Sequence, residues 1–321
     1  MSEAPLPGPV VCIVGPTASG KSSLAESVAL RLGSDVISVD AMQVYRGMDV
    51  GTAKTPVSER RVPLAMVDVA AVGEDFSVAL FQGMARGLVD ERLARGRVPV
   101  LCGGTGLYLD SVIDEMDFPA GDTRGEGRIR YERLADEGGP AALWELLRER
   151  DPESAAEIHP NNVRRVARAL EMLDEGTSYA DKHAGLKRRA AHYDARIWGL
   201  ARDRARLYQR IDDRVDEMFA QGLVDEVRAL VARGLRGDTT AGQAIGYKEV
   251  LDLLDGKVGE DEAIELVKRR TRRYAKRQLS WLRRDGRVRW IDLDHVGPEE
   301  ACDLIVADAA STDSQTNKRK C

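Results

Sequence analysis

Residues 10–22 read VVCIVGPTASGKS and match the pattern GxxxxGK[ST], placed between a short apolar run and a segment with helical spacing. The β-branched run 10–14 predicts a buried strand, and residues 22–32 predict a helix. In this motif the glycines let the backbone wrap a phosphate, and the helix N-terminus adds positive potential. The lysine reaches the terminal phosphates, and the hydroxyl can hold Mg²⁺. The sequence therefore predicts a diphosphate-binding loop in which Ser22 is the Mg²⁺ ligand. The loop consists of Gly15, Pro16, Thr17, Ala18, Ser19, Gly20, Lys21 and Ser22.

Beyond this loop, further strand-like runs alternate with helical segments. Residues 36–39, 98–102, 196–200 and 288–291 are short and apolar, whereas longer segments with helical spacing include 78–95, 202–220, 223–233, 247–254 and 261–283. Strands that alternate with helices predict a parallel sheet covered on both faces. We therefore predict an α/β protein with a P-loop NTPase-like parallel sheet core in residues 1–118 and 196–310. Residues 119–195 are typical of an all-helical insertion, and residues 311–321 of a disordered tail.

The composition excludes several classes of protein. The chain has 321 residues, of which 43% are hydrophobic and 31% charged, so it can bury a core without disulfides. No apolar run approaches the roughly 20 residues that a membrane span requires, and the N-terminus lacks the features of a secretory signal. The four cysteines form no CxxC pair, and the four histidines show no zinc-ligand spacing. These features predict a reduced, cytoplasmic protein with no membrane partner.

Basic residues are concentrated in two segments, although the net charge is −5. Residues 264–290 hold eleven Lys and Arg against two acidic residues, and residues 187–214 hold nine against four. The aromatic residues Tyr208, Tyr274 and Trp281 lie within these segments. Two interpretations remain open, namely solvated helix faces or contacts with phosphate or nucleic acid.

Two other segments follow predicted strands and therefore lie at the carboxyl edge of the sheet, where α/β proteins place substrates. Asp40 ends the second strand, and it is consistent with either a metal ligand or a general base. Gly103, Gly104 and Thr105 end the third strand. The Thr105 hydroxyl either binds a phosphate or carboxylate, or caps the helix that follows.

Several blocks of the chain resemble, in the same order, those of bacterial tRNA dimethylallyltransferases over roughly residues 10–290. They are GPTASGKS, VISVDAMQVYRGMDVGTAK, SVALFQ, VPVLCGGTGLYL, DPESAAEIHPNNVRRVARALE, AIGYKEV and RRYAKRQLSWLRR. The resemblance implies transfer of a dimethylallyl group from dimethylallyl diphosphate to N6 of the adenine just 3′ of the tRNA anticodon. It also implies Mg²⁺ as cofactor and the tRNA anticodon stem-loop as partner of a tRNA-binding helical insertion, and we expect a monomer.

The resemblance also implies roles for individual residues. Asp40 is the general base that takes the proton of the adenine amine, Thr105 contacts the adenine or the diphosphate, and Arg214 stabilises the leaving diphosphate. The residues expected to contact tRNA are Asp40, Ala41, Met42, Gln43, Thr105, Arg128, Arg164, Arg165, Arg168, Lys276 and Arg277. Ala41 replaces a serine that is common in the family, which weakens any hydrogen bond from that position.

Two other functions fit the same motifs. A P-loop kinase of a nucleotide or small metabolite would use the phosphate loop and Asp40, with the basic helices as a lid. A nucleotide-switched RNA-binding protein would use the loop and the basic segments without catalysing a reaction.

Overall fold

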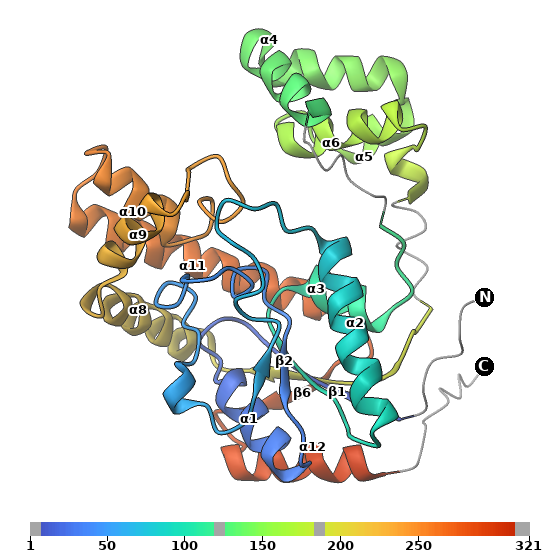
Figure 1. Ribbon diagram of the computed structural model, residues 1–321, viewed down its shortest axis with the longest axis vertical. Helices are drawn as coiled ribbons and strands as arrows, with labels where there is room; N and C mark the ends of the chain where they lie inside the picture. Colours follow the sequence, from blue (N-terminus) through green and yellow to red (C-terminus); the bar gives the residue numbers. More distant parts are fainter. Residues whose placement is uncertain (1–7, 119–125, 183–189, 312–321) are drawn as a thin grey trace. The chain divides into compact units, whose positions relative to one another are not determined.

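The computed structural model describes residues 8–118, 126–182 and 190–311, without the side chains of Glu126 and Arg128 (Figure 1). These residues form two compact units. Of the described residues, the first unit comprises 8–76, 80–113 and 191–311, and the second comprises 77–79, 114–118, 126–182 and 190. The predicted RNA contact of the Arg128 side chain lies outside the described residues, as does the predicted tail after residue 311.

The first unit is built on a six-stranded sheet in which all neighbouring strands are parallel. The strand order is β3-β2-β4-β1-β5-β6, so β1 lies inside the sheet and pairs with both β4 and β5. The strands are β1 (Pro9–Val14), β2 (Val36–Ser38), β3 (Leu64–Ala65), β4 (Val100–Gly103), β5 (Asp194–Ala201) and β6 (Arg289–Asp292). The predicted α/β fold with a parallel sheet core is confirmed.

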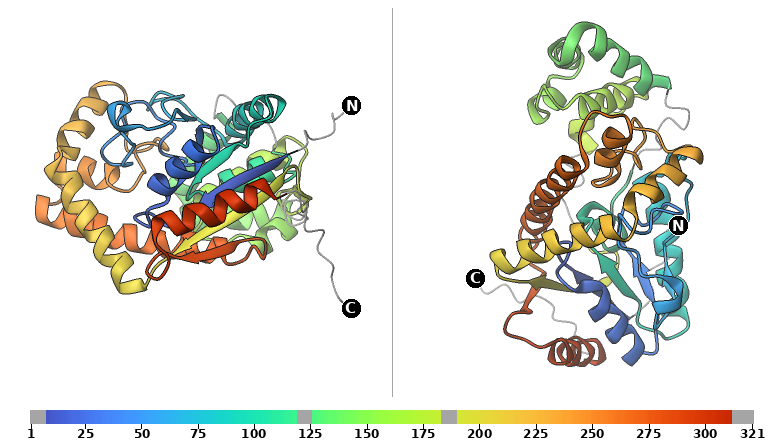
Figure 2. Two further views of the ribbon diagram at one scale, coloured as in Figure 1. Left: turned by 90° about the horizontal axis from the view of Figure 1, so that it is seen from below. Right: turned by 90° about the vertical axis from the view of Figure 1, so that its left-hand side faces the viewer.

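Both faces of the sheet are buried, which explains the continuous apolar run in β1. Val11 and Ile13 point into a core that they share with Val28 of α1 (Lys21–Arg31) and Ile305 of α12 (Pro298–Ala310). Figure 2 shows α12, drawn in red, lying across the sheet. The alternate β1 side chains, including Cys12, point to the opposite face and are also buried.

The other helices of this unit agree with the predicted segments to within a few residues. They are α2 (Val78–Ala94), α8 (Arg204–Ala220), α9 (Leu223–Ala232), α10 (Tyr247–Leu254) and α11 (Glu260–Leu282). Strand β3, the 3₁₀ turn η1 (Val57–Glu59) and α12 were not predicted, and the helix expected after Thr105 is the short α3 (Gly106–Ile113). Strand β3 has only two residues, which is too short for hydrophobic periodicity to define it.

The second unit consists of helices with a core of their own. It contains α4 (Glu126–Arg150), α5 (Pro152–Glu157) and α6 (Val163–Asp174). Helix α4 is interrupted at Gly139, whose φ of 81° is accessible to glycine, and the next residue is a proline. The Asp151 carboxylate caps α5 by accepting a hydrogen bond from the Ser154 amide at 3.0 Å. The core includes Leu143, Leu147, Val166 and Leu170.

Candidate active site

Three loops meet at the carboxyl edge of the sheet. The glycine-rich loop follows β1, Asp40 follows β2, and Thr105 follows β4. The Thr105 amide donates to the Val39 carbonyl at 3.4 Å, and its hydroxyl accepts a hydrogen bond from the Ala41 amide at 3.1 Å. The Thr105 hydroxyl therefore ties the loop after β4 to the loop that carries Asp40.

The loop between β1 and α1 is arranged to bind an anion. Gly20 is the N-cap of α1 with a φ of 98°, and it has no side chain to cap the first N–H groups of the helix. Arg210 Nε donates to the Ala18 carbonyl at 2.9 Å, and Arg202 Nε donates to the Ser19 carbonyl at 3.1 Å. Because carbonyl and amide point in opposite directions across a trans peptide, the Ser19 contact turns the Gly20 amide to the other side of the loop.

Two further cationic side chains, Lys21 and Arg214, also bond this loop. Lys21 Nζ donates to the Pro16 carbonyl at 3.3 Å, and Arg214 donates to the Thr17 hydroxyl at 3.4 Å. Burial lowers the pKa of both side chains. The nearby charge of Arg214 adds to the decrease at Lys21, and that of Arg210 adds to the decrease at Arg214. A bound anion would oppose this lowering, so these two side chains are suited to binding an anion.

Asp40 has a fixed orientation with one oxygen available. Its Oδ1 accepts hydrogen bonds from the amides of Met42 at 2.9 Å and Gln43 at 3.4 Å. Its Oδ2 has no hydrogen-bond partner within the part of the chain that the structure describes. Its negative charge partly offsets the lowering of the pKa of Lys21 and Arg214 by burial. A carboxylate held in this way is able to accept a proton from a bound molecule.

The phosphate loop and Asp40 line one cavity, with a volume of about 330 Å³. Lys21, Ser22 and Arg214 lie on its walls together with Asp40 and Thr105. The cavity is also lined by apolar side chains, among them Ile211, Val215, Met218 and Val267. The buried Cys102 thiol lines it too, and burial raises its pKa to about 11, so this thiol is neutral at physiological pH. The cavity therefore combines two cationic side chains, a carboxylate and apolar surface.

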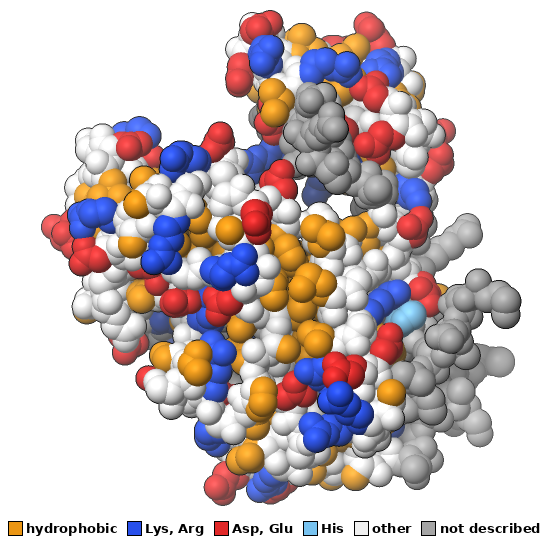
Figure 3. Space-filling model, in the orientation of Figure 1, with side chains coloured by type: hydrophobic (Ala, Val, Ile, Leu, Met, Phe, Trp, Pro, Cys, Tyr) orange, Lys and Arg blue, Asp and Glu red, His pale blue; other side chains and the backbone are white. Residues whose placement is uncertain are grey.

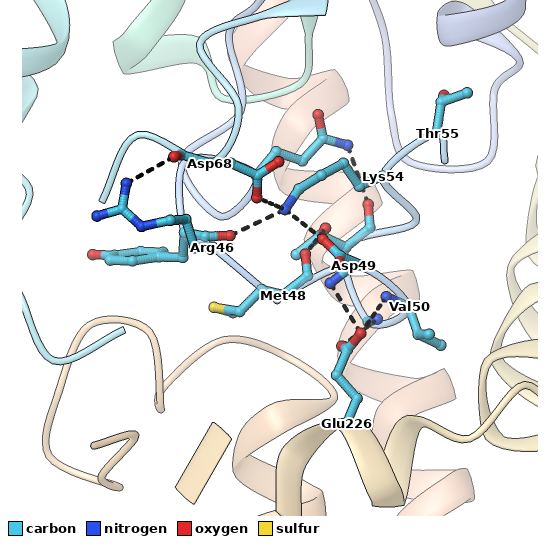
Figure 4. Close-up of polar contacts among 12 residues, drawn as sticks. Arg46, Met48, Asp49, Val50, Lys54, Thr55, Asp68 and Glu226 are labelled. Atoms are coloured by element: carbon cyan, nitrogen blue, oxygen red, sulfur yellow. Dashed lines mark hydrogen bonds and ion pairs between the residues drawn. The ribbon is translucent and has the colours of Figure 1, made fainter. Parts of the chain in front are cut away.

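A buried lysine holds the loop that follows Asp40. Lys54 is 2% exposed, and its ammonium contacts Asp49 Oδ1 and Asp68 Oδ1, both at 2.7 Å, and the Tyr45 carbonyl at 3.0 Å (Figure 4). Three bonds of this kind compensate for the loss of water around a buried cation. A further hydrogen bond, from Gln43 Nε2 to the Thr52 carbonyl at 3.2 Å, joins the two ends of the loop.

The same loop is held from the other side by Glu226 of α9. Its carboxylate accepts hydrogen bonds from three consecutive amides, those of Asp49, Val50 and Gly51, at 3.0, 2.7 and 3.3 Å (Figure 4). It also accepts a hydrogen bond from the Tyr247 hydroxyl at 2.6 Å. A Cβ on Gly51 would lie 2.6 Å from the Tyr247 ring, so only glycine fits there. The partners of Glu226 are about 175 positions away along the chain, so no local pattern marks this residue. Lys54 ends the block VISVDAMQVYRGMDVGTAK and two of its partners are only 5 and 9 positions away, but no role was predicted for it.

We expect the Lys54→Met substitution to lower the free energy of unfolding by about 1–3 kcal/mol, because it leaves the buried Tyr45 carbonyl unsatisfied and two carboxylates without their cation. Urea unfolding of the intact chain would measure this change. Lys257→Met is the matched control, because Lys257 also pairs with two aspartates but is 61% exposed. Its expected change is below about 1 kcal/mol, and an equal loss in both variants would contradict the proposed role of burial.

Further cavity residues come from the segment around the start of α10 and from α11. Gln243, Ala244, Ile245 and Tyr247 line the cavity from the start of α10 and the loop before it. Three of them belong to the block AIGYKEV, for which no site residue was predicted. Tyr274 of α11 also lines the cavity, and burial raises its pKa to about 12.

The basic residues of 264–290 divide into two groups. Five of them form ion pairs, namely Lys268, Arg270, Arg272, Arg287 and Arg289 with Asp216, Glu249, Asp212, Asp285 and Asp308. Lys276 and Arg277 are exposed, and Arg277 also lines the cavity and lies over the Tyr274 ring at 5.5 Å. On the face drawn in Figure 3, basic and acidic side chains are interspersed. The basic segment is therefore partly neutralised within the fold.

The predicted RNA-binding arginines of the second unit lie near the start of α6. Arg164 and Arg165 are exposed, whereas Arg168 is partly buried and pairs with Glu171. Among the described residues there is no cluster of three or more His, Cys, Asp or Glu side chains that could hold a metal ion. Within the same residues, every helix is either too short or too polar to span a lipid bilayer.

The parallel sheet and its surrounding helices define an α/β protein, and the glycine-rich loop after β1 is consistent with a P-loop-like core. The IPP transferase family model matches residues 43–285, and the isopentenyl transferase model matches residues 8–62. The chain therefore belongs to the IPP transferase family.

Known relatives agree with this family. The chain is 48% identical to the tRNA dimethylallyltransferase of Geobacillus thermodenitrificans, covering 88% of this chain and 90% of the relative. It is 47% identical to that of Salinispora arenicola, covering 89% and 82%. The crystal structure of the tRNA isopentenylpyrophosphate transferase of Bacillus halodurans is similar, with a TM-score of 0.68, 43% identity and coverage of 94% and 97%. A eukaryotic dimethylallyltransferase acting on tRNA gives a TM-score of 0.76 at 25% identity, covering 96% and 82%.

Proposed function

We propose that this protein transfers a dimethylallyl group from dimethylallyl diphosphate to N6 of the adenine immediately 3′ of the tRNA anticodon. The observation that carries this proposal is the single cavity shared by Lys21, Arg214 and Asp40. The cations suit the diphosphate, the apolar wall suits a five-carbon chain, and the carboxylate suits the acceptor amine. The family membership supports prenyl transfer over a kinase or a nucleotide-switched RNA-binding protein.

In the proposed reaction, the adenine N6 attacks the first carbon of the dimethylallyl group, and the bond from that carbon to the diphosphate oxygen breaks. Asp40 takes the proton that N6 loses as the carbon–nitrogen bond forms. The phosphate-loop amides, Lys21 and Arg214 stabilise the charge that develops on the departing diphosphate. Thr105 holds the loop of Asp40 in place through the Ala41 amide.

Mg²⁺ fits this site as a companion of the diphosphate. Ser22 lines the cavity and offers a hydroxyl oxygen, a ligand type that Mg²⁺ prefers. Mg²⁺ commonly keeps several waters and binds through one or two protein ligands plus substrate phosphates. When bound, the ion would neutralise charge on the diphosphate. ATP would compete for the same loop, because the loop recognises phosphates and not the attached group.

The acceptor in this proposal is the anticodon stem-loop, whose target base must be turned out of its stack to reach the cavity. Met42 and Gln43 line the cavity beside Asp40, and Arg277 lines it from α11, so these residues would meet the base and its flanking backbone. The exposed Arg164 and Arg165 suit the second unit for RNA backbone contacts. The proposal includes a monomeric enzyme that works in the cytoplasm, where its tRNA substrate is present.

Incubation with Mg²⁺, radiolabelled dimethylallyl diphosphate and bulk tRNA tests this function. We expect label in the tRNA fraction and, after digestion to nucleosides, in N6-isopentenyladenosine. A parallel reaction with labelled ATP serves as the control. ATP turnover without transfer of the prenyl label would instead indicate a kinase.

Binding of tRNA should weaken with increasing salt, because each neutralised phosphate releases counterions. With three to six contacts, the slope of log K against log salt would be about −2 to −4. Lys276→Ala should reduce the magnitude of this slope by about 0.7, whereas Lys257→Ala should not change it, because Lys257 already pairs with Asp252 and Asp255. Fluorescence titrations at several salt concentrations would measure both slopes. A slope near zero in the wild type would remove α11 from the interface.

A further inference from the structure

Gln278 of α11 connects two loops that are far apart in the sequence. Its side-chain carbonyl Oε1 accepts a hydrogen bond from the Thr17 amide of the phosphate loop at 2.9 Å. Its Nε2 donates to the Gly104 carbonyl, in the loop after β4, at 3.0 Å. The residue is 5% exposed, so its polar atoms need partners within the protein. In this stretch of α11, the expected role in RNA binding therefore applies to Lys276 and Arg277, whose side chains are exposed, and not to Gln278.

The two loops approach each other closely beside Gln278. A Cβ on Gly104 would lie 2.1 Å from Gln278 Nε2 and 3.0 Å from the Gly15 carbonyl. The two glycine-rich loops thus approach each other at Gly15 and Gly104, with the Gln278 amide bonded to both loops. Gly104 immediately precedes Thr105, and Thr17 also bonds Arg214, so each end of the bridge leads to a residue of the proposed reaction.

The chemistry of this position requires a neutral side chain that both accepts and donates. An ionised carboxylate of the same length would keep the bond to the Thr17 amide but would face the Gly104 carbonyl without a proton to share. A lysine or arginine would donate to the carbonyl but could not accept from the amide. An added negative charge would also oppose the diphosphate. Glutamine satisfies both loops and adds no charge to the anion site.

We propose that Gln278 is a positioning residue that sets the separation between the diphosphate loop and the Thr105–Asp40 side of the cavity. This inference rests on the proposed function, in which the two loops hold the two reacting partners. Small errors in the distance between partners lower the rate steeply. The predicted signature is a loss in kcat, with the KM for tRNA nearly unchanged because Lys276 and Arg277 remain in place.

The test uses Gln278→Glu and Gln278→Met, with Ser280→Ala as control because Ser280 is exposed and bonds only the Lys276 carbonyl of its own helix. Gln278→Met removes both bonds and should lower kcat about tenfold or more at every pH. Gln278→Glu should show a similar loss at pH 8. Its deficit relative to the wild type should shrink to about threefold near pH 5.5, because a protonated carboxyl can donate to the Gly104 carbonyl again.

Ser280→Ala should match the wild type throughout. A Gln278→Met enzyme with wild-type kcat would overturn the inference, and so would a Gln278→Glu deficit that stays the same at all pH values, since a packing defect alone does not titrate. Affinity for pyrophosphate, measured by calorimetry in the same variants, should weaken about tenfold with the same pH pattern. This second readout needs no transfer activity, so a wild type that transfers no prenyl group would refute the proposed function while the Gln278 bridge is still tested.

Discussion

Asp40→Asn is expected to lower the turnover of prenyl transfer by about 10²–10⁴-fold, the usual contribution of a general base. Asparagine has the same shape and keeps an oxygen that accepts the Met42 and Gln43 amides, so the loop should not move. It cannot take the proton of the adenine amine, because the amide group is not basic. Pyrophosphate affinity should stay within a few-fold of the wild type. Single-turnover kinetics with bound tRNA would separate this chemical effect from binding.

Glu26→Gln is the matched control for Asp40→Asn. Glu26 is another carboxylate on the cavity wall, and it lies 3.6 Å from Arg61. The same change from carboxylate to amide there should alter turnover by less than about threefold, equivalent to well under 1 kcal/mol in the barrier. Wild-type turnover in Asp40→Asn would exclude Asp40 as the base.

Lys21→Met is expected to lower the rate of prenyl transfer by about 10²–10³-fold, as removal of a single stabilising group at a developing anion commonly does. The loss should appear in pyrophosphate affinity as well, because Lys21 and Arg214 both line the anion site. Transfer assays together with calorimetric titration of pyrophosphate would measure it. An unchanged affinity would show that Lys21 does not contact the diphosphate.

The same substitution is expected to raise stability at neutral pH. Burial lowers the pKa of Lys21 in the folded protein, so below that lowered pKa folding carries the cost of a desolvated ammonium. Between the lowered value and the ordinary pKa of 10.5, the unfolded chain binds more protons, and stability therefore rises with pH. Lys21→Met removes this cost and should raise Tm at pH 7, by about 2–4 °C for each kcal/mol recovered. The gain should shrink as the pH approaches 10.5, and a lower Tm in Lys21→Met would contradict the argument.

The sequence predicted the parts of the site that lie close together along the chain. The strand, glycine loop and helix of residues 10–32 formed as expected, because their spacing and glycines act locally. The runs ending at Asp40 and Gly103 lie where predicted, because parallel strands present their carboxyl ends at one edge. The assigned chemical roles of Asp40, Thr105 and Arg214 remain predictions, which the variants above address.

The supporting contacts were not predictable, because they join residues that are distant in the chain. Gln278 bonds a loop 261 positions earlier, and Glu226 bonds amides about 175 positions earlier. Neither residue has a local pattern that marks it. The basic segment 264–290 also could not be divided by composition, because its partners Asp212, Asp216 and Glu249 lie on other helices. Periodicity reports which face is buried, but it does not report which partner lies there.

The position of β1 inside the sheet has a consequence for folding during synthesis. One neighbour of β1 is β4, at residues 100–103, whereas the other is β5, which pairs through residues 194–199. As the nascent chain leaves the ribosome, one side of this apolar strand stays unpaired until β5 emerges, and exposed strand edges promote aggregation. Fragments that end before Asp194 should therefore be insoluble on expression, even though they contain the whole phosphate loop.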